Sequence, residues 1–103
     1  MESDFQKMIN KAIEIKKRYN KIELKEWNLE QDFMGMAKDM GDLSKLLMIY
    51  KGYRAKENSN LKKEIEHELA DILWSVIVIA EKTGVNLEES FWDAMDELDK
   101  KLR

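Results

Sequence analysis

The chain has 103 residues and a formal net charge of −3, with 38% charged residues, four glycines, no proline and no cysteine. Its length fits one ordinary domain, and its Lys- and Glu-rich composition favours helices over tight-turned β-structure. The lack of cysteine excludes disulfides, thiolate zinc sites and a cysteine nucleophile. The acidic balance argues against a nucleic-acid-binding surface. We therefore expect a single all-α domain over 1–103 that binds no nucleic acid.

Two features of the sequence bear on where in the cell the protein is located. The first residues, MESDFQKM, lack the basic start and apolar core of a signal peptide. The longest apolar run, residues 72–80, is shorter than the stretch of about 20 residues that a membrane-spanning helix needs. We therefore expect a cytoplasmic protein with no membrane partner.

The first predicted helix begins after Ser3, a favoured N-cap residue, and extends to about residue 19. Residues 20–27 are predicted to form a connector. Apolar residues recur in the helix at spacings of three and four, which is the pattern of a helix with one buried face. These residues are Phe5, Met8, Ile9, Ala12 and Ile13.

The second predicted helix opens at Asn28, which together with Gln31 forms the pattern of a capping box, and ends at Gly52. Two glycines inside it, Gly35 and Gly41, disfavour the helix, and close packing of a neighbouring helix is our interpretation of their presence. Its predicted buried stripe consists of Phe33, Met36, Ala37, Met40, Leu43 and Leu47.

The third predicted helix covers residues 61–83. It follows a polar loop at 53–60, has Asn60 as its cap and ends at Gly84. Its first half has one apolar face, with Ile65, Leu69, Ile72 and Val76, but residues 72–80 are apolar on nearly all sides. A helix of that kind is predicted to lie centrally or in an interface.

The fourth predicted helix starts at another capping-box pattern, Asn86 with Glu89. It carries a single apolar stripe of Leu87, Phe91, Met95, Leu98 and Leu102. The four helices predict a four-helix bundle. Because three amphipathic helices of one short chain cover the apolar residues 72–80 poorly, we expect dimerisation to complete the bundle, as a homodimer or a dimer of dimers.

Two pairs of acidic residues stand out in the second and third helices: Asp39 with Asp42, and Glu68 with Asp71. Residues three apart on a helix lie on neighbouring faces, so that both side chains can reach the same point in space. If the two helices pack antiparallel, four carboxylates converge, and such a concentration of negative charge favours a bound cation. Carboxylate oxygens suit Mg2+, with Mn2+ as an alternative. Spacing alone favours ordinary surface charges, because 21 acidic residues form such pairs by chance.

The residues around these pairs carry a resemblance. The segments KDMGD (38–42) and ELADILW (68–74) resemble, in order, the EExxE and ExxD motifs of the MazG-like nucleotide pyrophosphohydrolase family. Trp27 before the second helix and GVNLEESF after the third fit the same pattern, so that the resemblance covers about residues 25–103.

The chain departs from the family pattern in two places. Lys38, Asp39 and Asp42 stand where the family usually has three glutamates, so one acid is lost and two are shorter by a methylene. The C-terminal segment ELDKKLR lacks the asparagine that family members often have there.

The resemblance implies an all-α, magnesium-dependent enzyme that cleaves nucleoside triphosphates to monophosphates and pyrophosphate, as nucleotide house-cleaning. The implied metal ligands are Asp39, Asp42, Glu68 and Asp71. Glu68 and Asp71 also count as catalytic residues, together with Glu64, which lies one turn before Glu68 and would orient or deprotonate a water.

The resemblance also directs attention to residues that would bind the substrate. Lys45, Lys51 and Arg54 are candidates for contacting phosphates, and Trp27 for stacking on a base. For each of these cations and for Glu64, an ordinary surface charge is the alternative.

Two other functions stay open for the whole chain. One is a catalytically inactive MazG-like bundle that acts in regulation or protein association, and the other is a metal-binding protein without nucleotide chemistry.

Overall fold

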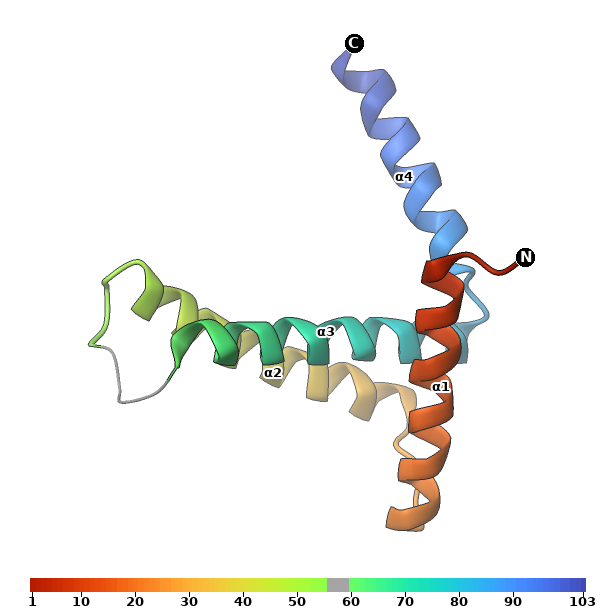
Figure 1. The fold of residues 1–103 in the computed structure, drawn as a ribbon, viewed down its shortest axis with the longest axis horizontal. Coiled ribbons are helices and arrows are strands. Elements are labelled where there is room, and N and C mark those ends of the chain that lie inside the picture. Colours follow the sequence, from red (N-terminus) through yellow and green to blue (C-terminus); the bar gives the residue numbers. More distant parts are fainter. Residues whose placement is uncertain (56–59) are drawn as a thin grey trace. The chain divides into compact units, whose positions relative to one another are not determined.

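The computed structural model describes residues 1–55 and 60–103, which contain four α-helices and no strand (Figure 1). The all-α prediction is therefore confirmed for these residues. They divide into two compact units, residues 1–26 with 77–103 and residues 27–76, which are described separately below. The single-domain assignment and the MazG-like bundle stay predictions. No helix in the described ranges is long and apolar enough to cross a membrane.

The first unit begins with α1 (Asp4–Glu23), which starts where its cap predicts. The Ser3 hydroxyl accepts a hydrogen bond from the Gln6 N–H at 3.0 Å. The helix continues past residue 19, so the predicted connector was wrong over residues 20–23. These residues include no glycine or proline, and the helix stops only at Leu24, which takes the left-handed conformation at φ 57°.

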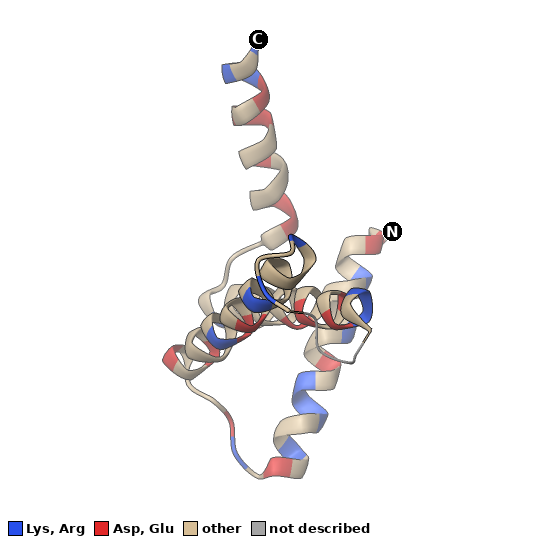
Figure 2. Ribbon diagram, turned by 90° about the vertical axis from the view of Figure 1, so that its left-hand side faces the viewer, with Lys and Arg blue, Asp and Glu red and all other residues tan. Residues whose placement is uncertain are grey.

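A lysine holds α1 against the end of α3 within the first unit. The side chain of Lys16 is only 12% exposed, and its ammonium lies 3.1 Å from a Glu81 carboxylate oxygen and 3.7 Å from one of Glu26. Two acidic partners offset the cost of burying a charge. Elsewhere α1 carries both signs of charge along its length (Figure 2).

The last helix, α4 (Leu87–Leu102), also begins as its cap predicts, because the Asn86 side chain accepts a hydrogen bond from the Glu89 N–H at 3.1 Å. Its apolar stripe, however, is open: every residue from 91 onward is exposed. The buried apolar residues of the first unit lie instead at the end of α3, at Ile77, Val78 and Ala80.

The second unit is a helical hairpin in which α2 (Leu29–Tyr50) and the first part of α3 (Leu61–Thr83) run antiparallel side by side (Figure 1). The capping box at its start is complete. Asn28 accepts a hydrogen bond from the Gln31 N–H at 2.8 Å, and Gln31 accepts one from the Asn28 N–H at 3.0 Å.

The turn side of the hairpin also follows the sequence. Gly52, at φ +81°, follows α2, and the Asn60 side chain caps α3 by accepting from the Lys63 N–H at 3.2 Å. Residues 53–55 and 60 are not helical, as predicted, and the remainder of the predicted loop, 56–59, lies outside the described residues. Gly84, at φ +73°, follows α3.

The face of α2 that turns toward α3 differs from the predicted stripe. Phe33, Met40 and Leu47 were predicted to be buried but are 59%, 52% and 44% exposed. Ala37 is also exposed, whereas Met36 and Leu43 are half-buried, as predicted. The other half-buried positions of α2 were not in the predicted stripe: Gly35, Asp39, Asp42, Leu46 and Ile49, and Asp32 is buried. Acidic and apolar stripes adjoin on this helix, and periodicity does not tell which part of the combined face meets the partner.

On α3 most of the predicted apolar face is confirmed, because Ile65, Ile72 and Val76 are half-buried. Leu69 is the exception at 53% exposed, and the neighbouring Glu68 is half-buried. The hairpin therefore directs carboxylates inward from both helices beside apolar residues, while several other large apolar side chains remain outside.

The glycines of α2 are not explained by a neighbouring helix, so that interpretation was wrong. A Cβ atom on Gly35 would lie 2.7 Å from Cζ3 of Trp27, the residue just before the helix cap. Gly35 therefore makes room for the Trp27 indole ring. At Gly41, by contrast, a Cβ atom would meet no described residue within 4 Å.

This difference gives a paired test. Gly35→Ala is expected to leave the free energy of unfolding about 1 kcal/mol below that of Gly41→Ala, because alanine favours the helix at both positions but at Gly35 the Trp27 ring must also move. Gly41→Ala is expected to raise it by up to about 1 kcal/mol, because alanine favours the helix and has room there. Urea unfolding of the full chain followed by circular dichroism measures both. Equal effects of the two substitutions would contradict the packing of Trp27 on Gly35.

Candidate functional site

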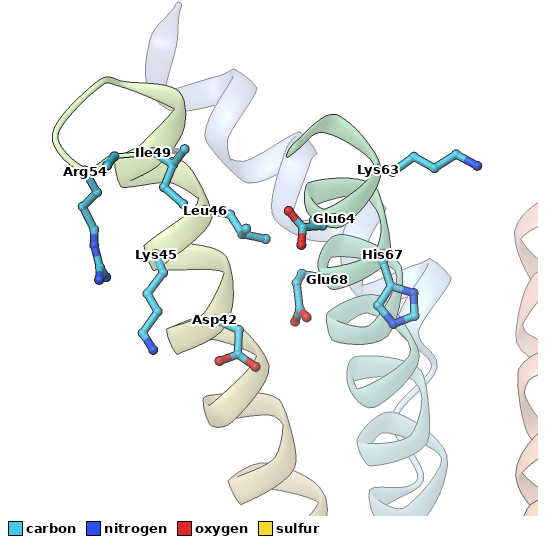
Figure 3. A pocket seen from close by; sticks show the side chains of 10 residues that line it. Asp42, Lys45, Leu46, Ile49, Arg54, Lys63, Glu64, His67 and Glu68 are labelled. Atoms are coloured by element: carbon cyan, nitrogen blue, oxygen red, sulfur yellow. The ribbon is translucent and has the colours of Figure 1, made fainter. Parts of the chain in front are cut away.

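Three carboxylates meet on the inner side of the hairpin. Asp39 and Asp42 of α2 and Glu68 of α3 each place one oxygen so that the three atoms lie within 4.8 Å of one another. All three residues are half-buried. Asp42 and Glu68 face each other across the two helices (Figure 3). We refer to Asp39, Asp42 and Glu68 as the acidic cluster.

Glu68 is the carboxylate of the acidic cluster that lacks a partner. Among the residues that the structure describes, its buried Oε2 atom has no hydrogen-bond partner. Burial, and then the negative charges of Asp39, Asp42 and Asp71, raise the pKa of the Glu68 carboxyl above its ordinary value. The folded protein thus favours a proton, or another positive charge, at this place.

The fourth predicted ligand, Asp71, lies outside the group of three. Its Oδ2 atom lies 3.1 Å from Nε2 of His67, one turn earlier on α3. Asp71 is near enough to contribute to the raised pKa of Glu68. Its role as a ligand stays a prediction.

A lysine contacts the acidic cluster from α2. The Lys38 ammonium donates to Oδ2 of Asp42 at 2.9 Å. This hydrogen bond and the charge of Asp42 raise the pKa of Lys38, and the charges of Asp39 and Glu68 act in the same direction. Lys38, the residue that differs most from the motif that the sequence resembles, is thus the cation nearest to these carboxylates among those with a described contact.

A cavity of about 570 Å³ adjoins the acidic cluster. This volume falls within the range of about 300–1,000 Å³ that is usual for small-molecule sites. Lys45 extends from α2 and Arg54 from the segment after it, while the Lys63 ammonium points away from α2 (Figure 3). The cavity is lined by Asp42, Lys45, Leu46, Ile49, Arg54, Ala55, Lys63, Glu64, His67 and Glu68.

The cavity includes five of the residues predicted from the sequence, Asp42, Glu64, Glu68, Lys45 and Arg54. It does not include Trp27, which packs on Gly35, or Lys51, the C-cap of α2.

Sequence reasoning missed several lining residues, among them Leu46, Ile49 and His67. Helical spacing contained the signal for them, since Leu46 lies four residues after Asp42, and His67 three after Glu64.

No protein-family model, no curated protein and no solved structure matches the chain. The functional assignment therefore rests on the motifs and on the chemistry of the residues described above.

The donor set fits a hard divalent cation. It consists of carboxylate oxygens alone, which Mg2+ and Mn2+ prefer over softer ligands. The buried oxygen of Glu68 has no hydrogen-bond partner in the described ranges, and a cation would offset its charge.

The raised pKa of Glu68 predicts how stability responds to pH. A carboxyl whose pKa is raised in the folded state favours folding below its unfolded pKa, and this contribution is lost as the pH rises through the folded pKa. In the absence of divalent cations, Glu68→Gln is therefore expected to raise the midpoint of thermal unfolding at pH 7.5. The gain is expected to shrink as the pH approaches 4.

The matched control is Glu66→Gln, at an exposed position of the same helix. It removes the same charge without relieving the acidic cluster, so its midpoint is expected to stay close to that of the unaltered protein. A lower midpoint for Glu68→Gln than for the unaltered protein at pH 7.5 without metal would show that the carboxylates do not strain the fold.

Proposed function

We propose that the chain is a cytoplasmic, magnesium-dependent nucleotide pyrophosphohydrolase of the MazG-like type. It would hydrolyse the α–β phosphoanhydride of a (deoxy)nucleoside triphosphate, giving the monophosphate and pyrophosphate. The observation that carries this proposal is the acidic cluster, in which three carboxylates from two helices converge within 4.8 Å beside a cavity that also holds cationic side chains.

Asp39, Asp42 and Glu68 would hold the metal, with Asp71 as a further ligand. When bound, Mg2+ offsets the charge of the phosphate oxygens and lowers the pKa of a water at the site; Mn2+ supplies the same chemistry. Without a cation the carboxylates of the acidic cluster would repel a polyphosphate, so an acidic substrate can bind at this acidic site only with a cation between them.

The cavity residues divide the remaining tasks. Lys45 and Arg54 would bind terminal phosphate oxygens, Arg54 with the paired donors that suit phosphate. Glu64 would accept the proton of the attacking water. Leu46 and Ile49 form an apolar wall that reduces the water around the charged groups. Trp27 would stack on the base and Lys51 would contact phosphate oxygens, both from outside the residues that line the cavity.

Exposed apolar side chains support association of the chain into a homodimer or a dimer of dimers. Among the described residues, only Ile77, Val78 and Ala80 are buried apolar residues. Four residues of the α4 stripe, Phe91, Met95, Leu98 and Leu102, are exposed, as are the outer apolar side chains of α2, and exposed apolar patches are typical of an interface. In this proposal dimerisation completes a MazG-like four-helix bundle.

The same exposed apolar surface favours a second candidate, an inactive bundle that acts in regulation or protein association. Such a bundle would have the same fold and the same interface but would not hydrolyse nucleotides.

Activity separates these functions. Incubation of the purified protein with each NTP and dNTP and Mg2+ is expected to release pyrophosphate. Glu68→Gln is expected to reduce the rate by about a hundredfold or more, because it removes a metal ligand, while Glu66→Gln retains the rate. Pyrophosphate release that does not exceed that of Glu68→Gln for any nucleotide would support the inactive bundle. Calorimetric Mg2+ binding that a non-hydrolysable nucleotide leaves unchanged would support a metal-binding protein instead.

Association is tested by sedimentation velocity at micromolar concentration, where the mass of a dimer or tetramer is expected rather than the 12.2 kDa of one chain. Substituting two residues of the α4 stripe, Phe91→Glu with Leu98→Glu, is expected to shift the distribution toward the monomer by placing charges in the interface. Sedimentation of the unaltered chain as a monomer would contradict this part of the proposal.

A further inference from the structure

The apolar stripe of α4 is open along most of the helix. Phe91, Leu98 and Leu102 are 51%, 48% and 78% exposed, and Met95 lies between them on the same face. The Trp92 ring packs edge-on against the Phe91 ring, with the ring centroids 5.7 Å apart, and widens this face. A helix with one continuous exposed apolar face is typical of pairing with another helix.

The stripe is symmetric about its own midpoint. Leu87 and Leu102 are equally far from this point in sequence, and so are Phe91 and Leu98. If two antiparallel copies of the helix are related by a two-fold axis through the midpoint, Leu87 of each copy lies level with Leu102 of the other, and Phe91 lies level with Leu98. Such an interface uses the same surface of both chains, so a second copy of this chain complements the stripe.

Charge selects the same direction. Glu88 and Glu89 lie in the first turn of α4, and Lys100 and Lys101 lie in the last turn. Acids first and bases last also suit the dipole of a single helix. The register of the apolar pairs, however, brings the acidic first turn of each copy level with the basic last turn of the other, where opposite charges attract. Parallel pairing would instead place acid beside acid and lysine beside lysine.

We propose that α4 is a self-association helix, which pairs antiparallel with α4 of a second copy about a two-fold axis near Met95. The 16 residues of α4 supply about 24 Å of helix for this contact. This inference rests on the association put forward under the proposed function, and it adds the surface and the direction in which the two chains meet.

Single-cysteine variants of the full chain test the proposal, because the chain has no cysteine of its own. Met95→Cys places the two sulfurs beside the two-fold axis, within the Cα separation of about 4.4–6.8 Å that a disulfide needs, so oxidation is expected to link the two copies. Leu102→Cys alone is expected to link at least about tenfold more slowly, because its two copies would lie about 22 Å apart at opposite ends of the pair. Electrophoresis without reductant measures each rate.

Two further samples complete the test. An equimolar mixture of Leu87→Cys and Leu102→Cys is expected to form the mixed disulfide, because these positions lie level in the antiparallel pair. The matched control is Asp96→Cys, which is exposed and adjacent to Met95 in sequence but lies on the side of α4 away from the stripe. It gives the rate of linkage by chance collision. Circular dichroism establishes that each variant is helical, and the mixture decides the question if Met95→Cys does not fold.

The outcomes distinguish the two proposals. If the unaltered chain sediments as a dimer or tetramer, linkage of Met95→Cys no faster than that of Asp96→Cys would overturn the antiparallel pairing and leave association by another surface standing. Linkage of Leu102→Cys to itself as fast as that of Met95→Cys would do the same, because it indicates parallel helices. Sedimentation of the unaltered chain as a monomer would overturn the association and this inference with it.

Discussion

Asp39, Asp42 and Glu68 lie close together in the α2–α3 hairpin, and the repulsion among their carboxylates is the main constraint on its structure. The three carboxylates occupy positions on the facing sides of two helices that apolar residues would fill in a hairpin built only for stability. Caps at Asn28 and Asn60 fix where the two helices begin. Burial, and then the neighbouring negative charges, raise the pKa of the Glu68 carboxyl.

This arrangement has a consequence for the rest of the second unit. Because acids take inner positions, Phe33, Met40 and Leu47 are left on the outside of α2. A sequence that departs from the usual rule of apolar residues inside at one place typically does so for function. The acidic cluster and the exposed apolar surface thus both follow from which face of α2 is turned inward. The proposed metal ion would offset the repulsion among the carboxylates, and the proposed partner chain would cover the exposed apolar side chains.

Local signals predicted the helices well. Asn28, Asn60 and Asn86 mark helix starts because each side chain satisfies a backbone N–H that the helix leaves open, and the structure has these hydrogen bonds. Gly52 and Gly84 follow helix ends because both adopt positive φ. The prediction failed at residues 20–23, where no such signal exists and the left-handed residue is Leu24.

The sequence by itself determined the helices, their caps and the positions of several carboxylates along α2 and α3. The tertiary structure decided which of them meet: Glu68 joins Asp39 and Asp42, whereas Asp71 turns toward His67. The physical reason is helical geometry, since residues three apart differ by about 60° around the axis, and only the packing of the two helices selects between them. The contact of Lys38 with Asp42 lies within one helix, but its charge becomes part of a site only through Glu68 of the other.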